Sequence, residues 1–308
     1  MPIIYKPGKR RFRLRQTAGD RIFGIINIAV LSVLTLITLL PVLAVALMSV
    51  TPMSDIQRNP NAFLIIPSYF TLNHYFWLFR GSSLLAQAYT VTTLRTLLGT
   101  AGCLLITALT AYPLSKKYLP GRNKIMLLFF FTMLFSGGII PTYLVVSSLK
   151  LLNTFWALII PSLLNVYNMI IMRTFFQGIP EEIDESARMD GASELTILFR
   201  IIMPLALPTL ASIGLFYAVY HWNAFTDSIM YIGASRDLWP LQMLMREIVI
   251  MNNTGEMQLG GAIRDPNRPS TSVIISCTLI VSALPIMCVY PFVQRYFVKG
   301  LVVGALKG

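Results

Sequence analysis

The clearest shortage in this 308-residue sequence is charge, because only 12% of its residues are Asp, Glu, Lys or Arg. A soluble domain usually carries about 25% charged residues. Hydrophobic residues make up 55% of the chain, and the mean hydropathy is +0.67. So few charges cannot cover the surface of a water-soluble globule of this length. The composition therefore excludes a cytosolic enzyme and a disordered tail, and it predicts a polytopic membrane protein.

Cysteine and histidine are also scarce, and their placement excludes two further classes of protein. The three cysteines, Cys103, Cys277 and Cys288, all lie inside apolar runs. Their odd number and apolar surroundings argue against the disulfide framework of a secreted domain. The two histidines, His74 and His221, lie far apart without a Cys or acidic partner at ligand spacing. No metal site is therefore expected.

Catalytic motifs are missing as well. The nearest candidate for a phosphate-binding loop, residues 300–308, has the wrong glycine spacing and lacks the Ser or Thr that binds magnesium. No GxSxG nucleophile motif occurs. The centres of the apolar stretches carry no acidic residue, so the carboxylate relay of a proton-coupled carrier is absent. We expect neither enzymatic activity nor a cofactor, and a membrane-embedded glycan-handling enzyme is the alternative.

Six apolar stretches reach the roughly 20 residues that a helix needs to cross a bilayer. They lie at about 22–50, 88–112, 124–147, 154–175, 205–226 and 271–294. Their continuity favours helices over the alternating strands of a β-barrel. The first stretch follows seven basic residues and resembles a signal peptide, but its length of about 29 residues exceeds the 7–15 of such a peptide. We predict an all-α integral membrane protein whose first span is retained.

The distribution of Lys and Arg predicts the orientation. With the N-terminus in the cytoplasm, 17 of the 25 basic residues fall on the cytoplasmic side and 7 on the other, and Arg95 lies inside the second span. This bias places both termini in the cytoplasm. The expected organisation is a basic arm over 1–21, a membrane domain over 22–295 and a cytoplasmic tail over 296–308. For Arg95 we favour snorkelling to the lipid headgroups over a role in a transport pathway.

Two long segments are expected outside the membrane, at 51–87 and 227–270. The aromatic residues of the first fit an interfacial belt. The second contains an apolar stretch, 238–251, which is too short and too charged to span, so we predict an interfacial or packed helix there. The polar loop that follows, 252–270, is well placed to meet a molecule outside the membrane, and a plain connector is the alternative.

The cytoplasmic segment 176–204 is unusual because five of the chain's 13 acidic residues fall within ten positions. Pro180 suits the first position of a helix, acids in the first turn complement the helix dipole, and Gly191 suits the left-handed position after a helix. The pattern therefore predicts one short helix over about 180–190. Ile183 and Ala187 are four residues apart and give this helix a narrow apolar stripe.

The spacing within this segment resembles a known motif. Glu185-Ser186-Ala187 is followed after three residues by Gly191 and after nine more by 201–204, which resembles the EAA motif of ABC importer permeases. Ser186 and Met203 depart from the usual Ala and Leu. The stretch 294–308 looks like the C-terminus of the second permease in maltose-type sugar importers. Residues 134–143 and 220–223 resemble the oligosaccharide and lipoprotein-linked branch of that group.

This resemblance implies the type I (MetI-like) permease fold with six transmembrane helices in a bacterial cell membrane. It further implies a heteromeric complex with a second permease, two ATP-binding subunits and an extracytoplasmic solute-binding protein, and it implies no nucleic acid. The cytoplasmic helix would then couple the permease to an ATPase subunit. By resemblance, the coupling residues are Glu181, Glu185, Ala187, Asp190, Gly191 and Pro204.

A substrate pathway is predicted from polar and aromatic residues inside the fourth and fifth spans. Rings, amides and hydroxyls suit the apolar faces and hydroxyl rims of sugars. Hydrogen bonding between helices is the alternative for each of these residues. The implied substrate is a carbohydrate, most simply an oligosaccharide, with another polar solute as the alternative. The candidate pathway residues are Asn165, Asn168, Phe216, Tyr220 and Asn223.

Overall fold

The computed structural model describes residues 18–58, 64–81, 83–254 and 269–305, and every regular element in these ranges is a helix. The chain divides into two units, Met1–Phe70 and Thr71–Gly308. Most of the predicted arm 1–21 and of the predicted loop 252–270 lies outside the described residues, as do the last three residues of the tail.

The first unit consists of α1 (Ala18–Val50) and the short α2 (Met53–Arg58). The 33 residues of α1 correspond to about 50 Å, more than the roughly 30 Å of a hydrocarbon core. Its large apolar side chains from Ile22 to Leu43 are all exposed. A helix that is apolar on every side is suited to lipid. In α2, the Asp55 carboxylate accepts a 2.7 Å hydrogen bond from the Ser68 backbone N–H.

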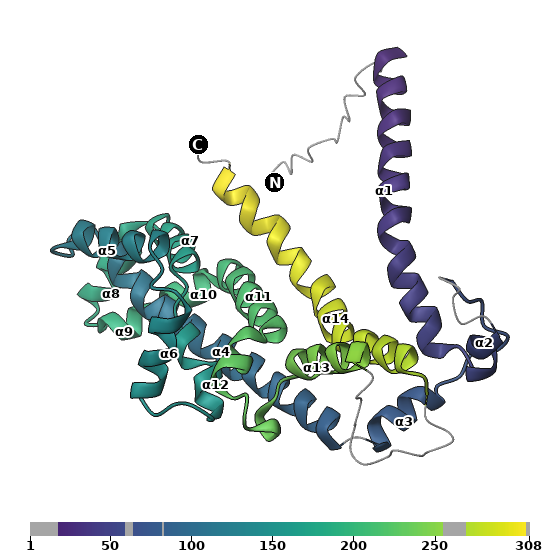
Figure 1. Ribbon diagram of the computed structural model, residues 1–308. Coiled ribbons are helices and arrows are strands. Elements are labelled where there is room, and N and C mark those ends of the chain that lie inside the picture. Colours follow the sequence, from purple (N-terminus) through teal and green to yellow (C-terminus); the bar gives the residue numbers. More distant parts are fainter. Residues whose placement is uncertain (1–17, 59–63, 82, 255–268, 306–308) are drawn as a thin grey trace. The chain divides into compact units, whose positions relative to one another are not determined.

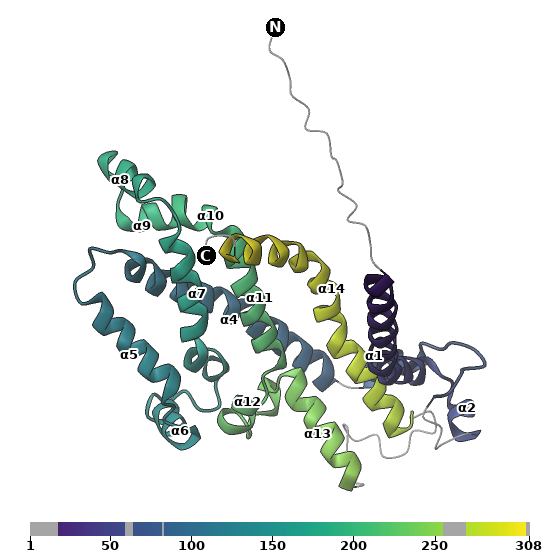
Figure 2. The ribbon, with the colours of Figure 1, turned by 90° about the horizontal axis from the view of Figure 1, so that it is seen from above.

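The second unit is built around one long helix, α4 (Ser83–Ser115). This helix packs against α7 (Val166–Gln177) and α11 (Leu207–Asn223), as Figures 1 and 2 show. α11 in turn packs against α14 (Thr271–Ala305), and the short α3 (Asn73–Gly81) contacts both α4 and α14. α4 is therefore the helix around which this unit assembles.

The predicted packed helix is present as α13 (Leu241–Thr254), which lies against α4 and α14. Its side chains Leu241, Met243, Leu244 and Ile248 are buried. α14 continues through the predicted boundary at 295, so the tail begins inside a helix rather than after one.

Three of the predicted spans are bent rather than straight. α5 (Arg122–Leu134) and α6 (Ile139–Ser148) meet at 114°, and the 3-10 turns η1 (Phe155–Leu158) and η2 (Ile160–Ser162) meet α7 at 52°. The segment Glu194–Leu205 meets α11 at 87°.

The stretches 124–147 and 154–175 are therefore not continuous helices. In the first, the helix is interrupted by 135–138, where Gly138 has a φ of +86°. In the second, Asn165 is extended and caps α7 with its side chain. Counting each bent pair as one span, the described residues contain up to six spans, which agrees with the predicted number.

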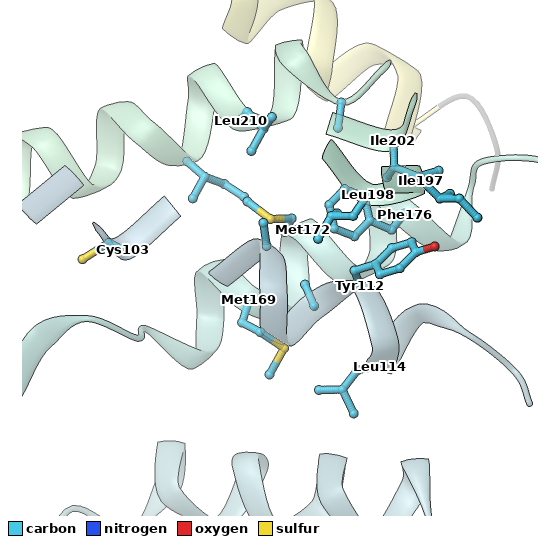
Figure 3. Close-up of a cluster of buried hydrophobic side chains, with 14 of the residues drawn as sticks. Cys103, Tyr112, Leu114, Met169, Met172, Phe176, Ile197, Leu198, Ile202 and Leu210 are labelled. Atoms are coloured by element: carbon cyan, nitrogen blue, oxygen red, sulfur yellow. The ribbon is translucent and has the colours of Figure 1, made fainter. Parts of the chain in front are cut away.

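Two groups of buried side chains stabilise the second unit. The Met172 cluster joins α4 and α7 to the segment 197–210; Figure 3 shows Cys103, Tyr112, Met169, Met172, Phe176, Ile197, Leu198, Ile202 and Leu210 among its members. The Trp239 cluster lies toward the start of α4 and includes Val91, Leu158, Ile232 and Trp239. The two clusters thus lie near opposite ends of α4.

The segment beside the Met172 cluster is a succession of short helices. α8 (Glu181–Met189) is followed by α9 (Glu194–Ile197), the π-helical turn η3 (Leu198–Ile202) and α10 (Met203–Leu205). After α11, the short α12 (Thr226–Tyr231) and η4 (Arg236–Leu238) lead to α13.

Candidate functional site

The helix predicted over 180–190 is α8. Pro180 is its N-cap rather than its first residue, so the helix begins one residue later than predicted, and Glu181, Glu182 and Asp184 occupy its first turn. After the helix, Gly191 has a φ of +79°, its N–H donates to the Arg188 carbonyl at 2.9 Å, and the Ala192 N–H donates to the Ala187 carbonyl at 3.0 Å. These paired bonds form a Schellman motif, which confirms the left-handed glycine that the sequence predicts.

α8 has one buried and one exposed face. Asp184 and Ala187 are buried, whereas Glu181, Glu185, Asp190 and Gly191 are exposed. Ala187 belongs to the Met172 cluster of this chain. Its small side chain therefore lets α8 approach its own membrane unit, and its predicted role in coupling stays a prediction. Gly191 is different, since a Cβ there would have no neighbour within 4 Å.

A network of charged and phenolic groups fixes the buried face of α8. The Asp184 carboxylate pairs with Lys116 at 2.7 Å and accepts a hydrogen bond from the Tyr112 hydroxyl at 3.0 Å. Arg188 pairs with Asp184 at 3.1 Å and with Glu194 at 2.6 Å, and it also donates to the Tyr118 hydroxyl. The network thus joins α8 to the end of α4 and to α9.

These groups determine the ionisation of Asp184. Burial alone would raise the pKa of its carboxyl, but hydrogen bonds from Lys116 and Tyr112, and the charges of Lys116 and Arg188, outweigh that effect. The pKa of Asp184 is therefore lowered from its ordinary value. Sequence reasoning did not select Asp184, and the one local signal was Arg188 four residues later.

A groove of about 500 Å³ runs between α8 and the turn after α4. Lys117, Tyr118, Arg122 and Glu181 are among the residues that line it. Lys117 pairs with Glu181 at 2.8 Å, but both side chains are largely exposed to solvent. This pair therefore contributes little to the attachment of α8.

Pro204 lies in α10, at the bend of 87° that precedes α11. Ala206 separates the two helices, and Pro208 is in the first turn of α11. The two prolines thus lie on either side of the bend between the segment 194–205 and α11, where they cannot donate the backbone hydrogen bonds of a continuous helix.

The structure brings together three of the five candidate pathway residues. Phe216, Tyr220 and Asn223 are spaced by four and three positions along α11, so they share one face, and all three are exposed. The Asn223 amide donates to the Val219 carbonyl at 2.9 Å. One face of α11 therefore presents two rings and an amide.

The two asparagines of the fourth span are placed differently from each other. Asn165 is exposed, and its backbone N–H donates to the Tyr217 hydroxyl of α11 at 3.3 Å. Its side chain accepts a hydrogen bond from the Asn168 backbone N–H at 3.1 Å. Asn168 is 6% exposed, so it does not line an open surface.

The snorkelling interpretation of Arg95 is wrong. Its side chain is completely buried and forms an ion pair with Asp227, while its Nη1 donates to the Ala224 carbonyl at 3.1 Å. A buried guanidinium requires a counter-ion, and here the counter-ion comes from a segment 132 residues later.

His221 is also buried, and its Nε2 lies 3.4 Å from the Cys103 sulfur. Gly99 makes this close packing possible, because a Cβ there would lie 2.6 Å from Nε2 of His221.

Within the described residues, no three His, Cys, Asp or Glu side chains are grouped so that they could hold a metal ion.

Most of the chain, from residue 17 to 303, matches the family described as the binding-protein-dependent transport system inner membrane component. The chain belongs to this family. It is therefore a multi-pass membrane permease and a transport subunit, and the ATPase of such a system is a separate subunit.

Two curated relatives come from Bacillus subtilis (strain 168). The polygalacturonan/rhamnogalacturonan transport system permease protein YtcP is 42% identical over 248 residues, covering 80% of this chain and 85% of YtcP. Protein LplC is 40% identical over 295 residues, covering 96% and 98% of the two chains.

A solved structure shares the fold of this permease. It is the crystal structure of a bacterial ABC transporter involved in the import of the acidic polysaccharide alginate, with a TM-score of 0.83 and 29% identity. The match covers 92% of this chain and 99% of that one.

Proposed function

We propose that this permease forms half of the translocation pathway of an ABC importer for carbohydrates, most simply oligosaccharides. The exposed face of α11 with Phe216, Tyr220 and Asn223 carries this proposal, because it offers aromatic rings and an amide to a polar solute. Asn165 lies at the start of the adjoining α7 and adds a second amide. The relatives that transport polygalacturonan or alginate support a sugar substrate.

We further propose that the exposed face of α8, with Glu181, Glu185, Asp190 and Gly191, contacts an ATP-binding subunit. The acidic side chains of this face are exposed and do not pack in the buried core of the permease, and the glycine after the helix leaves room for a partner to approach closely.

The proposed complex contains a second permease, two ATP-binding subunits and a solute-binding protein. The bias of 17 to 7 basic residues supports both termini in the cytoplasm, and we propose that the 252–270 loop docks the binding protein.

The pathway is tested by uptake into cells that carry the complete importer, with a panel of labelled neutral and acidic oligosaccharides, an amino acid and a monosaccharide. Deleting the chain is expected to abolish uptake of an oligosaccharide and leave the other solutes unaffected. Tyr220→Ala is expected to reduce that uptake roughly two- to tenfold, because a ring contact is worth about 0.5–1.5 kcal/mol.

Phe131→Ala is the matched control, because Phe131 is an exposed ring on α5, away from α11. It is expected to leave uptake unchanged. If every oligosaccharide still enters cells that lack the chain, the proposed substrate class is wrong. If Tyr220→Ala and Phe131→Ala behave alike, the α11 face does not line the pathway.

A further inference from the structure

We propose that Asp184 and Lys116 clamp α8 to the end of α4, and that α4 carries the movement of α8 to the segment that follows α11. This inference rests on the proposed coupling role of α8. It adds a route for the movement and assigns positioning roles to Asp184 and Lys116, both of which lie behind the face proposed to meet the ATPase.

The first observation is the direction of the bonds made by α8. In the described part of the chain, the side-chain hydrogen bonds and ion pairs that α8 makes with other elements lead to α4, to the turn after α4 or to α9. Asp184 is 7% exposed, and the side chain of Lys116 is 16% exposed. The Lys116 ammonium also lies 4.4 Å from the centre of the Tyr112 ring. These desolvated contacts hold α8 on α4 more firmly than exposed ion pairs could.

The second observation is that the segment connecting α8 directly to α11 is not stiff enough to transmit a movement. It passes through α9, the π-helical turn η3 and the 87° bend at Ala206. Bends at prolines and π-helical turns interrupt the regular hydrogen bonds that make a helix stiff. A displacement of α8 would therefore bend the segment 194–206 instead of moving α11.

α4 offers a stiffer route. It is a single helix of 33 residues, or about 50 Å. Pro113 is its one internal proline and lies in the last turn, beyond Tyr112. Pro113 removes the backbone hydrogen bond to the Leu109 carbonyl, so Tyr112 bonds to Asp184 from a turn that lacks one hydrogen bond. The connection through α9 is interrupted more severely, by a π-helical turn and an 87° bend.

The far half of α4 is tied in the same way to the segment after α11. Arg95 pairs with Asp227 and donates to the Ala224 carbonyl, and the Thr92 hydroxyl accepts a 2.7 Å hydrogen bond from the Leu241 N–H. Arg95 and Tyr112 are 17 positions apart on α4, which corresponds to about 26 Å along the helix, and Lys116 follows directly after its end. α4 is thus bonded to α8 near its C-terminal end and to residues 224–241 in its N-terminal half.

The experiment measures whether α8 and α4 move as one body. In the assembled transporter in lipid nanodiscs, with Cys288→Ala as background, spin labels are placed at Glu182→Cys on α8 and Leu98→Cys on α4, both of which are exposed. A second pair joins Glu182→Cys to Leu207→Cys on α11. Distances are recorded without nucleotide and with ATP plus vanadate, and ATP hydrolysis of the labelled complex is checked.

With the clamp intact, nucleotide is expected to change the distance from α8 to α11 and to leave the distance from α8 to α4 unchanged. In Lys116→Met, the distribution of distances from α8 to α4 is expected to become broad and to change when nucleotide is added. Lys117→Met is the matched control, because its ion pair with Glu181 is exposed. Lys116→Arg, which keeps the positive charge opposite Asp184, is expected to retain a single distance.

Two results overturn the inference alone. One is a distance from α8 to α4 that changes with nucleotide while the clamp is intact, and the other is a constant distance in Lys116→Met. If Lys116→Met does not assemble, Asp184→Asn provides the same comparison with a smaller change. If no label on α8 responds to nucleotide, and Gly191→Trp still retains the ATP-binding subunits, the proposed coupling role fails as well.

Discussion

Arg95 shows how the meaning of a charge inside a span depends on a partner that is distant in sequence. Considered alone, an arginine eight residues inside a predicted span is explained by snorkelling. Asp227, which lies 132 positions later in the sequence, pairs with this arginine, so that its charge is neutralised inside the protein. No local pattern contains this pairing, so sequence reasoning could not reach it.

We predict that Arg95→Gln strongly destabilises the permease, because Asp227 loses its counter-ion in a largely buried site. Removing one partner of a buried pair typically costs about 3–5 kcal/mol. The measurement is thermal unfolding of the purified complex in detergent. The double variant Arg95→Leu with Asp227→Leu is expected to cost less than the single change. Equal stability of Arg95→Gln and the unaltered protein would contradict the structural role of the pair.

Gly191 is a residue whose local role the sequence predicts well, since the acids before it and the glycine itself define where α8 ends. We predict that Gly191→Trp abolishes ATP-driven transport and leaves membrane insertion intact. The change fills the space beside an exposed backbone that we propose to meet the ATPase.

Gly121→Trp is the matched control for the Gly191 variant. Gly121 also has a positive φ, of +74°, and a Cβ there would likewise have no neighbour within 4 Å. It therefore carries the same backbone strain at a different place. Both uptake and retention of the ATP-binding subunits are measured. Equal losses in the two variants would mean that strain, rather than a lost contact, explains the effect.

Among the elements, α8 and its C-terminus follow from helix capping rules, whereas the interruptions of the spans do not. Hydropathy averaged over about 20 residues identifies 124–147 and 154–175 as apolar. It carries no information about the backbone at Gly138 or about the side chain of Asn165 that caps α7. The bends depend on these single positions, and the buried partners of Asp184 depend on how α8 packs against α4.

The attachment of α8 is expected to depend on pH through Asp184. Its pKa is lowered in the folded protein, so its ionised form stabilises the attachment fully above the ordinary pKa of an aspartate, about 4. That contribution is lost as the pH falls through the lowered pKa. We predict that the mobility of a spin label at Glu182→Cys is constant from neutral pH to about pH 4 and rises below it.

Asp184→Asn provides the comparison for this titration. The amide cannot ionise, so the acid-dependent rise in mobility is expected to be much smaller, and the label is expected to be more mobile at neutral pH. A rise of the same size in both proteins would show that another group is responsible. Glu194, which also accepts from Tyr112 and pairs with Arg188, would then be examined by Glu194→Gln.

At the scale of the whole molecule, composition was sufficient to predict a membrane protein, and charge distribution was sufficient to propose its orientation. The family and the six spans also followed from the sequence, because the spacing around Gly191 and the six apolar stretches are properties of the chain itself. The arrangement of α4 at the centre of the second unit depends on contacts between distant segments, which sequence spacing does not reveal.

The whole chain is expected neither to bind nor to hydrolyse ATP, because its sequence contains no phosphate-binding loop. The purified subunit is assayed alone and after assembly with its ATP-binding subunits. Hydrolysis is expected only in the second case. Activity of the isolated subunit that persists after removal of contaminating ATPases would contradict this prediction.

The Arg95–Asp227 pair also has a consequence for biosynthesis. At about 5–20 residues per second, Asp227 is synthesised roughly 7–26 s after Arg95. During that interval α4 must enter the bilayer with an unneutralised guanidinium, at a cost of about 2.5–3.5 kcal/mol on insertion scales. Among the three straight candidate spans, α4 is also the least apolar, with a hydropathy of 1.6 against 2.7 and 2.3. Of these three spans, α4 is therefore expected to depend most on the translocon for its insertion.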